Sequence, residues 1–208
     1  MASSFLIGLA LAAASGPPLP AAGPGSFDLA GVRLGMAPES VRRSLTRSGY
    51  GIGRETRLES YARQVAARIE ALRGRVGPSA FEAVAAIEAV GPSGERVAVT
   101  FGQWPDGPHV VEVALTVDPN RQTQDAFRAQ AEGRFGPPTM HVLGGWRWCG
   151  AGERRCGPMA DPELPTLDAD YQARTLTLKI GGEALQQRRA LVEADARRAV
   201  PLRHGSAF

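Results

Sequence analysis

The feature that most constrains the fold is a strict alternation of apolar with polar or small residues in two neighbouring segments. Segment 96–101 places apolar side chains at every second position, at Val97, Val99 and Phe101. Segment 111–117 follows a Pro-Asp-Gly turn at 105–107 and repeats the period with Val111, Val113, Leu115 and Val117. Because successive side chains of a strand point to opposite faces, these segments predict an antiparallel hairpin that buries one face only.

Further strands are predicted on both sides of this hairpin. Segment 81–90 is Ala-rich and also fits a helix, but a Gly-Pro-Ser-Gly turn follows at 91–94 and favours a strand. Segment 27–34 fits a short strand or an extended lead-in. Three more strands are predicted at 145–149, 166–171 and 174–180.

Four helices are predicted from apolar residues at helical spacing and from residues typical of helix ends. They cover residues 38–49, 59–73, 123–135 and 183–199. The order of elements predicts an α+β fold of two helix-plus-antiparallel-sheet units and a C-terminal helix. We assign the units to residues 25–120 and 121–208; because the halves share no visible sequence identity, a tandem repeat is a structural hypothesis.

Residues 1–24 are interpreted as a signal peptide and a tether rich in Pro, Ala and Gly. The unbroken apolar run at 5–14 has the length of a secretory h-region and is too short to span a bilayer. No Lys or Arg precedes it, so an apolar core element is the alternative, but the tether connects poorly to a packed element. No later segment approaches 18 apolar residues. We therefore expect a soluble bacterial protein, periplasmic or secreted, with no transmembrane segment after signal removal.

Two short motifs resemble a known family of small envelope proteins. The stretch Gly-Val-Arg-Leu-Gly-Met-Ala-Pro-Glu-Ser-Val at 31–41 resembles the helix entry of the BamE (SmpA/OmlA) family, and Phe-Gly-Pro-Pro-Thr at 135–139 resembles its Gly-x-Pro helix end. Tandem helix-plus-sheet units are also the architecture of the β-lactamase inhibitor protein. The resemblance implies a periplasmic α+β module. Because the leader has no cysteine, unlike the family's lipoprotein members, we expect no lipid there.

The only two cysteines, Cys149 and Cys156, are separated by six residues. An even pair across a Gly-rich turn in an oxidising compartment predicts a disulfide. Closing so short a loop would stabilise the fold by about 2.5 kcal/mol. A redox pair usually has two intervening residues beside a helix start, and the spacing is too wide for zinc with His141 as the only further ligand nearby.

A recognition surface is predicted around the same cysteines. Trp146 and Trp148 share one face of a predicted strand, with Arg147 on the other face and Arg154 and Arg155 nearby. Trp and Arg are enriched at binding hot spots, so these five residues are the candidate interaction surface. The alternative is that both rings fill the core between sheet and helix.

No motif predicts catalysis, a cofactor or a metal. The three histidines, His109, His141 and His204, are scattered, and Asp168 and Asp170 fit a solvent-facing strand. The sequence therefore favours a non-enzymatic module that binds another envelope protein through its exposed sheet face or through the hairpin around the cysteines. The alternatives are a small periplasmic hydrolase with a dispersed site, in which Asp168 or Asp170 would lie beside His141, and a small-ligand-binding protein with an apolar pocket.

The charge distribution predicts no nucleic-acid partner. The formal net charge is only +3, from 24 basic and 21 acidic residues, and Lys179 is the single lysine. Segment 42–75 holds nine arginines against Glu55, Glu59 and Glu70. That excess could meet an anionic surface such as lipid headgroups, but pairing at helical spacing favours a solvated helical face. The oligomeric state is left open.

Overall fold

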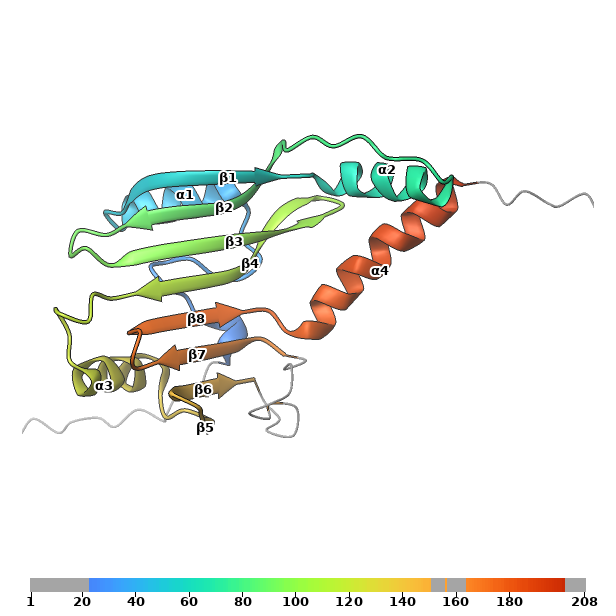
Figure 1. Cartoon of the computed structure of the whole chain (residues 1–208). Helices are drawn as coiled ribbons and strands as arrows, with labels where there is room; N and C mark the ends of the chain where they lie inside the picture. Colours follow the sequence, from blue (N-terminus) through green and yellow to red (C-terminus); the bar gives the residue numbers. More distant parts are fainter. Residues whose placement is uncertain (1–22, 151–155, 157–163, 201–208) are drawn as a thin grey trace, which may run out of the picture.

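The computed structural model describes residues 23–150, 156 and 164–200, which contain four α-helices and eight strands. The strands form one antiparallel sheet in the order β1-β2-β3-β4-β8-β7-β6-β5 (Figure 1). In chain order the elements are the 3-10 helix η1 (Pro24–Ser26), α1 (Pro38–Arg47), β1 (Gly51–Leu58), α2 (Tyr61–Leu72), β2 (Ala83–Val90), β3 (Arg96–Trp104), β4 (Gly107–Thr116), α3 (Gln124–Phe135), β5 (Met140–Val142), β6 (Gly145–Cys149), β7 (Thr166–Asp170), β8 (Thr175–Lys179) and α4 (Gly182–Ala199).

The predicted α+β fold class is confirmed, and each predicted helix lies close to its expected position. The ambiguous Ala-rich segment is strand β2. Segment 27–34 is a lead-in, in which Leu29 and Val32 form one isolated bridge and are both fully buried. Their burial explains why the segment alternates like a strand although no neighbour continues the pairing.

Two strands were not predicted from the sequence. β1 lies at one edge of the sheet, and none of its residues is buried, so it has no apolar alternation to detect. It also contains Gly51 and Gly53 and shows two register irregularities. Such irregularities are typical of edge strands, where they hinder pairing with a strand of another molecule. β5 lies at the opposite edge and is only three residues long.

One face of the sheet, hereafter the covered face, packs against α1 and α3. The core on this face combines strand residues such as Val99, Val113 and Leu178 with Leu45 of α1 and Phe127 of α3. In Figure 1, α1 lies behind the sheet. The residues between these core positions point to the other side, which we call the open face.

The two predicted units meet within the sheet. β4 pairs with β8, so Val113 lies opposite Leu178 and Leu115 opposite Leu176. The core cluster includes residues from both units. The boundary at residue 120 therefore separates two stretches of chain that contribute to one continuous core.

Helices α2 and α4 pack mainly on each other. They meet in a V beyond the ends of the strands in Figure 1. Tyr61 is the only buried residue of α2, and Ala196 is the only one of α4. Polar contacts join the two helices, since Tyr61 donates to Asp195 at 2.8 Å and Arg68 binds Glu193 at 2.5 Å. Within the described residues, no helix has both the length and the apolar character needed to cross a membrane.

Candidate protein-docking face

The centre of the open face carries small side chains. Alternation in β3, β4 and β8 directs apolar residues into the core. The opposite side carries the charged residues Arg96, Glu112 and Lys179, and between them alanine or threonine at positions 98, 100, 114, 116, 175 and 177. The hydroxyls of Thr116 and Thr175 lie 2.9 Å apart across two strands. This part of the face therefore lets a partner approach the sheet backbone closely.

A hollow of about 510 Å³ lies on the open face over β1 to β4. Ala98, Ala114 and Gly53 are among its lining residues, and Gly53 lies at a register irregularity in β1. Val90 also lines the hollow, and 49% of its surface is exposed. A second hollow of about 330 Å³ shares Arg96 and Thr116 with the first. The two depressions therefore adjoin at Arg96.

Charged residues border the small central side chains. On β1 and β2, Arg54 faces Glu88 at 4.0 Å. On the other side, Arg147 donates two hydrogen bonds to Asp168 at 2.5 and 2.9 Å, and Lys179 lies 3.2 Å from the same carboxylate. Hydrogen bonding to Asp168 raises the pKa of Arg147, although partial burial opposes this shift. The open face thus has small side chains near its centre and charged side chains at its border. Protein interfaces likewise have a polar rim.

The predicted interaction surface is divided between the two faces. Trp146 and Trp148 lie on the covered face with only 9% and 3% of their surfaces exposed. The Trp148 indole donates to the carbonyl oxygen of Gly136 at 2.9 Å, and the Arg128 guanidinium lies 4.2 Å from the Trp146 ring centroid. Both rings are therefore core residues, because the gap between the sheet and α3 requires bulky side chains. Arg147, the third member of the predicted interaction surface, lies on the open face, opposite the two tryptophans.

The remaining members of that surface, Arg154 and Arg155, lie outside the described residues. The predicted cysteine pairing agrees with the geometry, because Cys149 and Cys156 lie at disulfide distance with their Cα atoms 6.3 Å apart. Cys156 is buried, so the pair anchors the chain beyond β6 to the folded part of the protein.

The residues of the predicted hydrolase alternative are not brought together. His141 is exposed and its ring lies against Trp146 on the covered face, with centroids 4.4 Å apart and the two planes tilted by 51°. Asp168 is on the open face, and Asp170 accepts hydrogen bonds from two backbone amides of the next turn. Within the described residues, no three His, Cys, Asp or Glu side chains are arranged to hold a metal ion.

The other two histidines are also remote from a shared site. His109 has one ring nitrogen 3.1 Å from the Gly35 carbonyl oxygen and the other 3.0 Å from the Asp106 carboxylate. The hydrogen bond from His109 lowers the pKa of Asp106. This histidine joins the β3–β4 hairpin to the lead-in before α1, which is a structural role. His204 lies outside the described residues.

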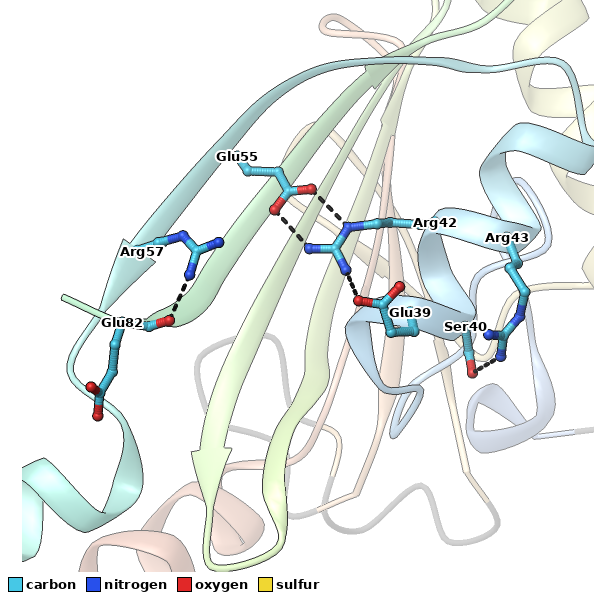
Figure 2. Close-up of polar contacts among 7 residues, drawn as sticks. All are labelled: Glu39, Ser40, Arg42, Arg43, Glu55, Arg57 and Glu82. Atoms are coloured by element: carbon cyan, nitrogen blue, oxygen red, sulfur yellow. Dashed lines mark hydrogen bonds and ion pairs between the residues drawn. The ribbon is translucent and has the colours of Figure 1, made fainter.

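The basic segment 42–75 is largely neutralised by its own neighbours. Arg42 donates two hydrogen bonds to Glu55, at 2.8 and 2.7 Å, and also contacts Glu39 (Figure 2). These contacts raise the pKa of Arg42, and its hydrogen bond lowers the pKa of Glu55. Arg57 donates to the Glu82 carbonyl oxygen at 2.8 Å. The ion pairs of Arg42 with Glu55 and Glu39 join α1 to edge strand β1. They support the interpretation that the arginines of this segment lie on a solvated face and pair with neighbouring carboxylates.

The fold and this face define an α+β protein with a one-sided antiparallel sheet. Comparison with known proteins adds no family to this description: the chain matches no protein-family model, and no curated protein or solved structure is significantly similar to it.

Proposed function

We propose that this protein is an exported, non-enzymatic module of the bacterial envelope that binds another protein through its open face. The observation that carries the proposal is the asymmetry of the sheet. One face is covered by α1 and α3, whereas the small-residue centre of the other has a hollow of about 510 Å³ and charged residues at its border. A partner side chain seated in this hollow would be surrounded by polar residues, which is the arrangement of buried centre and polar rim found at protein interfaces.

Export is proposed from two independent features of the chain. The apolar run at 5–14 has the length of a secretory h-region. The cysteine pair at disulfide distance suits an oxidising compartment, because cytosolic thiols are kept reduced. Titration of free thiols in the unfolded, unreduced protein should find none. Two titratable thiols would contradict the disulfide.

The docking face can be tested with two matched variants. Ala98 is exposed on the open face, and Ala129 is exposed on α3, on the opposite side of the molecule. The oxidised protein and its Ala98→Trp and Ala129→Trp variants are used as baits in an envelope extract, and each captured protein is purified and titrated separately. We expect Ala98→Trp to abolish direct binding of the true partner and Ala129→Trp to leave it unchanged. Equal loss or equal retention in both variants would refute the open face as the docking site.

A chemical footprint gives an independent measurement. Lys179 is the only lysine, and its side chain, 34% exposed, borders the open face. Acylation of this amine is followed by mass spectrometry with and without the purified partner. A partner on the open face should slow acylation of Lys179, whereas a partner on α1 or α3 should not.

A further inference from the structure

The hollow over β1 to β4 indicates what kind of partner segment the open face accepts. We propose that it receives a segment that presents a bulky apolar residue and a nearby acidic residue, and that the acidic side chain pairs with Arg96. This inference rests on the proposed function, because it assigns a partner chemistry to the same face.

The apolar part of the proposal follows from the lining of the hollow. Ala98, Ala114 and Gly53 bring little side-chain volume, and Val90 presents half of its surface to solvent. The volume, about 510 Å³, lies within the range of about 300–1,000 Å³ that is typical of ligand sites. None of the described lining residues is aromatic. A bulky apolar side chain of a partner would fit into part of this space and bury aliphatic surface that is now exposed.

The acidic part follows from the position of Arg96. Its neighbours across the sheet are Val90 on β2 and Thr116 on β4, neither of which can neutralise a guanidinium. Within the described part of the chain, Arg96 is exposed and has no ion-pair partner. A guanidinium can donate two parallel hydrogen bonds to a carboxylate, which gives both energy and orientation. An acidic residue would gain this pair, and a basic residue would be repelled.

The same lining disfavours two other occupants. A polyanion such as nucleic acid or a lipid surface needs many cations, but the hollow has only Arg54 and Arg96, and Arg54 already faces Glu88. A partner strand added to β1 would meet two register irregularities and the charged residues 54, 55 and 57. The geometry therefore favours a single carboxylate beside an apolar group.

The test uses four capped peptides of equal length that differ only in a central dipeptide: Phe-Asp, Phe-Asn, Phe-Lys and Ala-Asp. Each is titrated at millimolar concentration into ¹⁵N-labelled full-length protein, and amide shifts are followed by NMR. We expect the Phe-Asp peptide to shift the amides of Val90, Ala98 and Ala114. It should bind about three- to tenfold more tightly than the Phe-Asn peptide, as expected for a partly desolvated ion pair, and more tightly than the Ala-Asp peptide.

Charge variants test the role of Arg96 directly. Arg96→Gln should abolish the preference for Phe-Asp over Phe-Asn, and Arg96→Glu should transfer the preference to Phe-Lys. Arg43→Gln is the matched control for Arg96→Gln, because Arg43 is exposed on α1 and, among the residues that the structure describes, bonds only to the hydroxyl of Ser40 (Figure 2). Arg43→Gln changes the net charge by the same amount as Arg96→Gln and should leave the affinities of all four peptides unchanged.

The possible results separate this inference from the proposed function. Equal binding of the Phe-Asp and Phe-Asn peptides, or no shift of any open-face amide with any peptide, would overturn the inference. The proposed function would survive that result if a purified partner still lost binding to the Ala98→Trp variant. A partner that is insensitive to both Ala98→Trp and Arg96→Glu would overturn both.

Discussion

The two pairs of helices in this protein are held in different ways. Helices α1 and α3 pack on the sheet and bury apolar residues that include Val41, Leu45, Phe127 and Phe135. Helices α2 and α4 pack on each other, bury one residue each, and are joined by hydrogen bonds and ion pairs. The first pair therefore belongs to the hydrophobic core, and the second forms a peripheral clamp.

We expect apolar burial, and not helix length, to set the local stability of these helices. Of the described helices, α4 is the longest at 18 residues, and α1 has 10. Apolar burial contributes about 25 cal/mol per Å², whereas exposed ion pairs contribute little. The shorter α1 should therefore unfold only with the whole sheet, and the longer α4 should open locally together with α2.

The largest expected effect comes from the core shared by α1, α3 and the sheet. Leu178 on β8 is fully buried, so Leu178→Ala should lower the free energy of unfolding by about 2–5 kcal/mol. Leu191→Ala is the control in α4, where 40% of the leucine is exposed, and should change it by less than about 0.5 kcal/mol. Urea denaturation measures both. Similar losses in the two variants would show that α4 belongs to the core.

A smaller effect is expected where α3 ends against the sheet. Trp148→Phe removes the hydrogen bond to the carbonyl oxygen of Gly136 and part of a buried ring. We expect a loss of about 1–3 kcal/mol, because the carbonyl oxygen of Gly136 loses its indole donor and the core loses part of a large ring. The measurement is thermal unfolding at constant pH. A change within error would mean that solvent replaces the indole and that α3 is looser than its packing indicates.

Acid should destabilise helices α2 and α4 at a pH at which the sheet is still folded. Hydrogen bonds from Arg68 and Arg197 lower the pKa of Glu193 from 4.5 to about 2. Because the folded-state pKa is the lower one, this contribution is present above pH 4.5 and is lost as the pH falls towards 2. Protection factors, which correct hydrogen exchange for its intrinsic pH dependence, should therefore fall in α2 and α4 before they fall in β3 and β4. Glu193→Gln should show the lower protection of α2 and α4 already at neutral pH, and protection that is lost first in the sheet would contradict the prediction.

The smallest effect is expected from a single hydroxyl of the clamp. Tyr61→Phe removes the hydrogen bond to Asp195 and keeps the buried ring. We expect faster hydrogen exchange in α2 and α4 and no measurable change in the global unfolding midpoint. A shift of that midpoint comparable with the Trp148→Phe variant would place the clamp within the cooperative core.

Local patterns predicted most elements of this fold but only part of its surface. β3 was predicted because alternate residues are buried, and α1 because Pro38 and Gly49 mark its ends. β4 was predicted from the same alternation, but a register irregularity buries Val110 in place of Val111. β1 was missed because an edge strand with no buried residue has no alternation. Trp146 and Trp148 were placed in a candidate surface because the same aromatic residues suit a core and an interface equally well.

The sequence by itself determined the fold class, the positions of the helices and most strands, and the one-sided character of the central hairpin. These properties depend on periodicity and on end residues, which act over a few neighbouring positions. Only the tertiary structure decided that β4 pairs with β8, that Trp146 and Trp148 face the core, and that Arg96 borders a hollow. Each of these depends on which distant segments pack together, and that choice is made by burial of apolar surface over the whole chain rather than by any local pattern.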